Sequence, residues 1–451
     1  MTEVYGDGPG RHNVCVPAIP AVPAHQLAAL LQSELDRWGI PGAVAGVLAC
    51  GEAVVCASGV ASLATGEPVN GSTPFRVASI TKPITATLAA LLAHEGLLDL
   101  DAPVRRQLPD LRLADEQAQE TVTLRQLLAH LSGLECEPAH DMSVHSAGAG
   151  ALGELIGTYG ALGQLTPPGE IWSYCNTGYW LAGHAIARAA GMTFEQVAHD
   201  LLLGPLGMPG SGFVHDGVPP TGAALGHTPR RPGHPAHDVI AGYRFPRSRV
   251  PSGGLVSTVP DLLRLASLHL DSPDLAALRD PVTAAVGTRW GTGWSLELLD
   301  TTVVAAHSGS YGGFQTQLVL VPAHRVAVAV LTNSGRGSAL VRTVVEWALA
   351  AVCNLRRPEP VPVTVDPAQF EGVYHAQGLT VEIRADGSRL RATQRVRLAS
   401  GNELTPPPLL GVAVTADRFA VLEGEARGAQ FDFPGPGRVR FGSRLALRAG
   451  S

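Results

Sequence analysis

The sequence predicts an α+β fold with an antiparallel sheet flanked by helices, a helical subdomain beside it, and a small β-domain at the C-terminal end. Strand-like segments occur near both ends of residues 25–355, with mostly helical patterns between them, so distant segments should share one sheet. A proline-rich linker over 356–367 then leads to residues 368–451, whose short alternating segments are typical of strands.

The first part of the chain should supply a helix and a hairpin to this sheet. Residues 1–24 are interpreted as an N-terminal extension, and residues 26–38 carry apolar side chains at helical spacing. Residues 42–63 predict two strands joined by a turn at Gly51 and Glu52.

The middle of the chain should be mainly helical. A helix is expected to begin near Ser79, because Pro83 is tolerated only in the first turn of a helix. Residues 120–250 indicate helices joined by long loops. Strand patterns return from residue 302, and a helix is expected over about 338–353.

The residues after the linker predict a domain made of short strands. Asp386 and Gly387 stand between two alternating segments and are typical of a hairpin turn. No internal repeat is visible in the chain.

Composition and charge exclude several classes of function. The net charge is −6 without a block of like charges, so no nucleic-acid partner is expected. No apolar run is long enough to span a membrane, and the N-terminus lacks the pattern of a signal peptide. We therefore expect a cytoplasmic protein without membrane attachment. The six cysteines lack metal-ligand spacing, so free thiols and no metal or cofactor are predicted.

Lys82 is the only lysine in the chain, and all other basic residues are arginine. A buried ammonium group can lose its proton, whereas a guanidinium group does not, so a site that needs a neutral amine requires lysine. Ser79 precedes Lys82 by three residues, which places the hydroxyl and the amine on one face of a helix. The pair suggests a nucleophile and its base; the alternative is a surface lysine that follows a serine by chance.

Two further motifs stand where loops or strand ends would present them. The first is Tyr174-Cys-Asn176, and the second is His307-Ser308-Gly309 at the end of a predicted strand. Taken singly, Tyr174 could be a packed aromatic side chain and Asn176 a turn residue, and His307 alone is no more specific.

These motifs, in this order, resemble the serine β-lactamase and penicillin-binding-protein superfamily, above all its class C, D-aminopeptidase and family VIII esterase branch. Ser79-x-x-Lys82 matches the nucleophile motif and Tyr174-x-Asn176 the Tyr-x-Asn motif. His307 begins the tripeptide that stands where the family carries Lys-Thr-Gly or His-x-Gly. Further stretches match in family order at 124–134, 204–208, 252–265 and 291–298. The resemblance covers about residues 25–350 and implies a β-lactamase/transpeptidase-like fold.

The resemblance also implies a mechanism through acylated Ser79. Lys82 would accept the serine proton, Tyr174 would shuttle protons, and Asn176 would hydrogen-bond the substrate. Backbone N–H groups of Ser79 and Ser310 would form the oxyanion hole, with His307, Ser308 and Gly309 lining the substrate site beside it. The expected substrate is a small-molecule or peptidyl ester or thioester, for which presentation by a carrier protein is one option.

His307 departs from the family lysine that holds the carboxylate of penicillins, because histidine is mostly neutral near pH 7. With the predicted cytoplasmic location, this favours a biosynthetic acyltransferase, or a thioesterase that releases or cyclises peptides by forming an amide. Penicillin-binding-protein-type thioesterases resemble this chain in carrying a C-terminal lipocalin-like β-domain. That domain should cover one side of the pocket, where Arg444 or Arg448 could meet a substrate carboxylate; taken singly, each is more simply interpreted as a side chain that faces solvent.

Several alternatives stay open. A family VIII-type esterase, or an amidase or D-aminopeptidase, would hydrolyse small esters or peptides; a β-lactamase and a non-catalytic scaffold rank behind these. Cys175 is expected to point away from the site into the core. His227, His234, His237 and Asp238 offer metal-ligand types, but the surrounding prolines and glycines favour an irregular loop.

Overall fold

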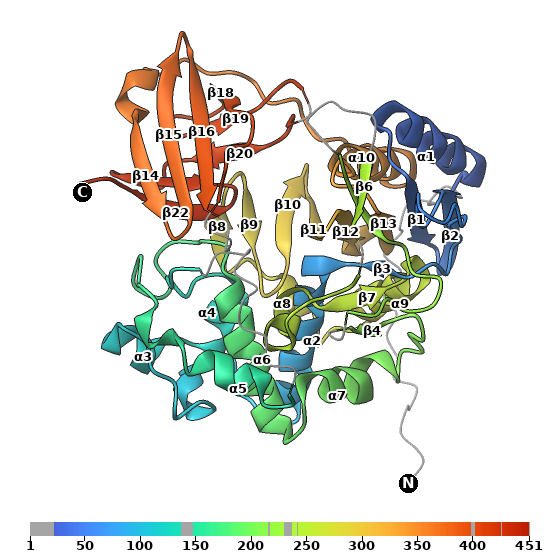
Figure 1. Cartoon of the computed structure of the whole chain (residues 1–451), viewed down its shortest axis with the longest axis horizontal. Helices are drawn as coiled ribbons and strands as arrows, with labels where there is room; N and C mark the ends of the chain where they lie inside the picture. Colours follow the sequence, from blue (N-terminus) through green and yellow to red (C-terminus); the bar gives the residue numbers. More distant parts are fainter. Residues whose placement is uncertain are drawn as a thin grey trace.

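The computed structural model contains an eight-stranded antiparallel sheet, formed by strands between residues 42 and 332, and a β-barrel beside it at the C-terminal end of the chain (Figure 1). The structure describes residues 22–136, 148–214, 217–229, 237–240, 242–397, 402–424 and 426–450. The strand order of the sheet is β2-β1-β13-β12-β11-β10-β9-β8. Its strands are β1 (Gly42–Ala49), β2 (Glu52–Gly59), β8 (Thr283–Ala285), β9 (Thr288–Trp290), β10 (Ser295–Leu299), β11 (Thr302–Tyr311), β12 (Phe314–Val321) and β13 (Val326–Thr332).

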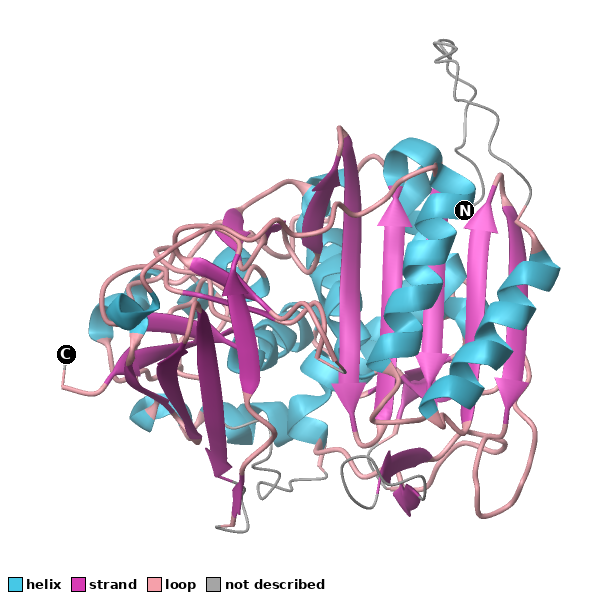
Figure 2. Ribbon diagram, turned by 90° about the horizontal axis from the view of Figure 1, so that it is seen from above, coloured by secondary structure: helices cyan, strands magenta, loops and turns pink. Residues whose placement is uncertain are grey.

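Both faces of this sheet are buried because helices cover each of them. Alternate side chains of a strand point to opposite faces, so Ala45 and Val47 of β1 join one core while Val44 joins another. Helices α1 (Ala24–Trp38) and α10 (Ser338–Cys353) cover the first face and lie across the strands in Figure 2. Helices α2 (Thr81–His94) and α9 (Val259–Asp271) pack against the second face. The sheet thus pairs strands from the beginning of residues 25–355 with strands from their end, as the sequence predicted.

A helical subdomain flanks the second face. Its elements are α3 (Glu116–Thr121), α4 (Leu124–Leu128), α5 (Ala151–Ile156), α6 (Asn176–Ala190), α7 (Phe194–Ala198) and α8 (Val250–Gly253). Two small sheets lie beside it, formed by β3 (Phe75–Arg76), β7 (Leu255–Ser257) and β4 (Gly212–Phe213), and by β5 (Gly226–Pro229) and β6 (His237–Ile240). Together with the large sheet, these helices confirm the predicted β-lactamase/transpeptidase-like fold.

The C-terminal domain is a closed barrel of eight antiparallel strands, which confirms the expected lipocalin-like β-domain. The order is β15-β14-β22-β21-β20-β19-β18-β16, and pairing of β15 with β16 closes the ring. The strands are β14 (Gly372–Ala376), β15 (Leu379–Asp386), β16 (Arg389–Arg397), β18 (Leu409–Ala413), β19 (Arg418–Ala420), β20 (Gln430–Asp432), β21 (Arg438–Phe441) and β22 (Arg444–Arg448), and β17 (Glu403–Leu404) extends β16. Phe419 and Phe431 are fully buried and stack inside it at 5.5 Å, so side chains fill the barrel.

Two expectations need correction in detail. Strand structure returns earlier than the predicted start at residue 302: the short strands β4 to β7 lie between residues 212 and 257, and the large sheet resumes at β8, near residue 283. Residues 78–80 form a 3-10 turn before α2 begins at Thr81, so Pro83 lies at the third helical position. Within the described ranges, no helix is long and apolar enough to cross a membrane.

Candidate active site

Ser79 lies in a tight turn at the start of α2. Ala78, just before it, has φ +48°, a left-handed conformation that a residue with a Cβ adopts only under strain. The Thr81 hydroxyl holds the turn, because it donates to the Ala78 carbonyl at 2.7 Å and accepts from Leu255 N–H at 3.1 Å. The turn fixes the Ser79 side chain at the N-terminal end of α2, the helix that carries Lys82.

Lys82 is completely buried one turn along the same helix. Its Nζ is hydrogen-bonded to Ser79 Oγ at 3.1 Å and donates to the Ser252 carbonyl at 2.7 Å. Nζ also lies over the rings of Tyr174 and Tyr179, 4.9 and 5.2 Å from their centroids. Burial lowers the pKa of Lys82 well below its ordinary value, because a charge is unfavourable where water is excluded. The only lysine of the chain is therefore in the environment that neutralises an amine.

Tyr174 reaches Ser79 from the segment that precedes α6. Its hydroxyl is hydrogen-bonded to the Ser79 side chain, and burial raises the pKa of Tyr174 above its usual range. Asn176, two residues later, is the first residue of α6 and is half-buried. Cys175 between them is 1% exposed and packs into the core, as expected from the sequence. The structure thus brings Ser79, Lys82 and Tyr174 into contact, with Asn176 two residues from Tyr174 along the chain.

His307 lies on β11 beside Tyr174, with ring centroids 6.4 Å apart. Its Nδ1–H donates to the Ser308 carbonyl at 2.8 Å, while the buried Nε2 has no hydrogen-bond partner among the described residues. Burial, and then the charge of Lys82, lowers the pKa of His307 to about 3. The ring is therefore neutral near pH 7, with an acceptor lone pair on Nε2.

Gly309 lets β11 approach the Ser79 turn. A Cβ at this position would lie 2.1 Å from the Val77 carbonyl oxygen and 2.4 Å from Thr316 Oγ1, so only glycine fits. The Thr316 hydroxyl donates to the Val77 carbonyl at 3.0 Å and fastens β12 to the same turn. Ser308 and Ser310, on either side of Gly309, are exposed, and Ser310 Oγ accepts from the Gln315 amide at 2.9 Å.

A cation reaches this site from the C-terminal barrel. Ser443 O accepts from Tyr174 N–H at 2.9 Å, and Leu445 N–H donates to Ser173 Oγ at 3.1 Å. Arg444, between these two anchors, is half-buried and forms no ion pair with any described carboxylate. Its charge contributes to lowering the pKa of Lys82, which places the guanidinium within electrostatic reach of the site. Arg448, the other expected candidate, instead donates to the Glu371 carbonyl of its own barrel.

The β-lactamase family profile matches residues 27–351. The chain belongs to the β-lactamase family. Penicillin-binding protein 4 of Amycolatopsis lactamdurans is 30% identical over 368 residues, which cover 75% of this chain and 94% of that protein. Esterase EstB of Burkholderia gladioli is 32% identical over 361 residues, which cover 69% and 90%. The crystal structure of SurE with D-Leu superimposes with a TM-score of 0.73 at 26% identity, covering 94% of this chain and 99% of SurE. The protein is thus a serine hydrolase or acyltransferase of the β-lactamase family.

Aromatic side chains beside Tyr174, which were not among the site residues predicted from the sequence, form a wall of the site. His130 stacks on Tyr174 at 4.3 Å and lies against Trp172 and Trp290 at 6.0 and 5.3 Å. His130 has φ +60°, and its Nδ1 accepts from Cys175 N–H at 3.0 Å. His130 lies in the stretch at 124–134 that matched the family, but the sequence alone gave no role for this histidine.

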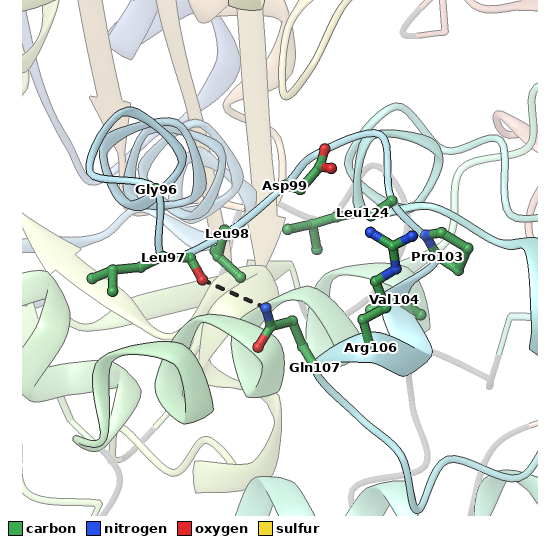
Figure 3. A pocket seen from close by; sticks show the side chains of 10 residues that line it. Gly96, Leu97, Leu98, Asp99, Pro103, Val104, Arg106, Gln107 and Leu124 are labelled. Atoms are coloured by element: carbon green, nitrogen blue, oxygen red, sulfur yellow. Dashed lines mark hydrogen bonds between the residues drawn. The ribbon is translucent and has the colours of Figure 1, made fainter.

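The remaining sequence candidates lie away from this site. Both ring nitrogens of His227 are hydrogen-bonded, Nδ1 to the Asn333 carbonyl at 2.9 Å and Nε2 to Leu63 N–H at 3.1 Å. His234 lies outside the described residues, and no group of three possible metal ligands occurs within them. A cavity of about 170 Å³ beside Leu97 and Arg106 contains none of the predicted site residues (Figure 3).

Proposed function

We propose that this protein transfers an acyl group from an ester or thioester to Ser79 and then to an amine, forming an amide. Lys82 Nζ lies 3.1 Å from Ser79 Oγ. Because burial lowers the pKa of Lys82, the neutral amine can take the Ser79 proton as Oγ attacks the acyl carbonyl. Arginine could not take this proton.

Tyr174 acts as the relay in this scheme. Since its pKa is raised, the phenol keeps its proton near pH 7 and donates it to the leaving alcohol or thiol. Protonated Lys82 replaces that proton on the phenol and returns to the neutral form. The oxyanion of the tetrahedral intermediate is assigned to the backbone N–H groups of Ser79 and Ser310, and Asn176 is assigned to the acyl substrate.

His307 favours an amine as the acceptor. A neutral ring with a free Nε2 lone pair cannot hold a carboxylate by charge, but it can accept a hydrogen bond from an incoming N–H group. The same property argues against strong binding of the penicillin carboxylate at this position.

The observation that carries the substrate assignment is Arg444. It is a half-buried cation that forms no ion pair with a described carboxylate, held beside Tyr174 by hydrogen bonds of its two neighbours. A free carboxylate on the substrate would supply the missing partner. D-leucine, which is present in the SurE structure, has both an amine and a carboxylate. We therefore propose an amino acid or peptide with a free carboxylate as acceptor, and a carrier-bound thioester as one form of donor. The biosynthetic role and the cytoplasmic location stay predictions.

The test offers a peptidyl thioester together with either a D-amino acid or the matching amino acid amide, and identifies the products by mass. We expect amide product with the D-amino acid, and loss of the acyl-enzyme in Ser79→Ala. Arg444→Gln should raise KM for the carboxylate acceptor at least tenfold and leave hydrolysis of a neutral p-nitrophenyl ester unchanged when it is measured on the high-pH plateau, where Lys82 is neutral in both proteins. Arg448→Gln, on the same strand, is the matched control and should behave as wild type.

Ester hydrolysis is the second candidate, and the similarity to EstB favours it. If excess amine yields only free acid, and the p-nitrophenyl ester turns over faster than any thioester, the protein is an esterase and the transfer proposal is wrong. Equal KM values for the D-amino acid and its amide would remove Arg444 from the substrate site.

A further inference from the structure

Two thiols meet at the segment that carries Tyr174 and Asn176. Cys175 is buried in this segment, whereas Cys136 is half-buried and comes from a chain region forty residues earlier. The two side chains are hydrogen-bonded to each other, and both are free thiols. Neither sulfur takes part in the acyl-transfer scheme.

Cys136 also caps the N-terminus of α6. Its Sγ accepts from Asn176 N–H at 3.2 Å and from Thr177 N–H, while Cys175, the N-cap residue, provides no side-chain cap of its own. N–H groups and the positive end of the helix dipole favour a negative charge on sulfur at this position.

The pKa values of the two sulfurs are shifted in opposite directions by these contacts. The hydrogen bond from Cys175, the charge of Arg444 and the N–H groups of α6 lower the pKa of Cys136 well below its ordinary value. The same sulfur contact and burial raise the pKa of Cys175. A half-buried cysteine with a lowered pKa beside a buried thiol is the arrangement of an oxidisable cysteine and its resolving partner.

We propose that Cys136 and Cys175 are a peroxide-sensitive pair whose disulfide reversibly stops catalysis at Ser79. The Cys136 thiolate attacks one oxygen of hydrogen peroxide, the O–O bond breaks, and hydroxide leaves and becomes water with the proton that the Cys136 thiol released on ionising. Sulfenic acid at Cys136 is then attacked by the sulfur of Cys175, the S–O bond breaks, and the hydroxyl leaves as water with the Cys175 proton. Two thiols and one peroxide thus give one disulfide and two waters.

The disulfide would disturb the site because the segment around Cys175 is held on several sides. Tyr174 N–H is bonded to Ser443 O at 2.9 Å, Cys175 N–H to His130 Nδ1 at 3.0 Å, and Asn176 N–H to Cys136 Sγ at 3.2 Å. A disulfide brings the sulfurs to about 2.05 Å, far inside a hydrogen-bonded contact, and removes the thiolate that caps α6. A shift of about 1 Å in a catalytic group can lower the rate about 100-fold.

The experiment treats the reduced full chain with hydrogen peroxide and follows the rate of Ser79 labelling by a fluorophosphonate. This readout is independent of the acceptor, so it separates this proposal from that of amide formation. We expect the labelling rate to fall at least tenfold, in step with a Cys136–Cys175 linked peptide in the mass map, and to recover with dithiothreitol. Cys136→Ser should resist peroxide, whereas Cys50→Ser, which removes an exposed thiol elsewhere, should respond as wild type.

Three outcomes would overturn the proposal. The first is an equal loss of labelling in Cys136→Ser. The second is oxidation of wild-type Cys136 to sulfinic acid without a linked peptide. The third is complete formation of the linked peptide with unchanged labelling. The last two use the unaltered chain, so they decide the question even if Cys136→Ser fails to fold.

Discussion

Replacement of Lys82 by arginine tests the central step of the proposed chemistry. Both residues are long and cationic, so a role in fixed-charge stabilisation would be partly retained. Arginine, however, cannot become the neutral base that takes the Ser79 proton. We therefore expect Lys82→Arg to be nearly as damaging as Lys82→Ala.

The magnitude follows from the environment of Lys82. Nζ is fully buried, 3.1 Å from Ser79 Oγ and 2.7 Å from the Ser252 carbonyl oxygen. Loss of a positioned general base costs about 10²- to 10⁴-fold in rate, or about 3–5.5 kcal/mol in activation free energy. The bulkier guanidinium also brings a permanent charge into this buried space, so the loss should lie in the upper part of that range.

The assay measures kcat/KM for a p-nitrophenyl ester and the rate of fluorophosphonate labelling, with thermal unfolding to confirm that each variant is folded. For wild type, the pH profile should reach its plateau well below pH 10.5, because burial lowers the pKa of Lys82 from that value. Retention of more than about a tenth of wild-type activity by Lys82→Arg, a barrier change of only about 1.4 kcal/mol, would refute the base role.

Two further predictions concern packing and pH. Gly309→Ala places a Cβ 2.1 Å from the Val77 carbonyl oxygen, so it should cost about 1–3 kcal/mol in urea unfolding and slow acylation; Gly212→Ala, with no atom within 4 Å, is the control and should change neither. His307 and His269, which is fully buried on α9, have folded-state pKa values of about 3. These values lie below the unfolded value of about 6.5, so the unfolded chain binds more protons between pH 3 and 6.5. Each should therefore reduce stability by up to about 1.4 kcal/mol per pH unit as pH falls from 6.5 towards 3, measured by urea unfolding. A slope that is unchanged in His307→Gln would contradict this assignment.

Long elements with a clear period could be predicted from the sequence. Strands β1 and β13 are continuous runs of buried apolar residues, and α10 repeats apolar side chains at helical spacing. Strands β8 and β9 were missed because each has three residues, too few to show an alternation. The β15–β16 hairpin at Asp386 and Gly387 could be predicted, but closure of the barrel was beyond a local pattern, since it also depends on pairing between β14 and β22, which are far apart in the sequence.

The candidate site likewise contains contacts that could be predicted from the sequence and contacts that could not. Ser79 and Lys82 are three residues apart on one helical turn, so their contact follows from helix geometry. His130 and Cys136 reach the Tyr174 segment from more than thirty residues away, and no spacing rule relates them. Their importance depends on what they touch, which only the folded chain specifies.

Arg444 shows why a residue type and its strand position are not enough to assign a site. Arg444 and Arg448 are four residues apart on β22, so strand alternation gives them the same face and cannot separate them. The fold separates them because β22 begins beside Tyr174, where Ser443 and Leu445 bond the catalytic region, and continues away into the barrel, where Arg448 bonds Glu371. If the transfer proposal is correct, the carboxylate-binding cation has moved from β11, where His307 now stands, to a different domain. A carboxylate held there would lie on the Tyr174 side of the acyl-enzyme, which is the side from which an acceptor amine must reach its proton relay.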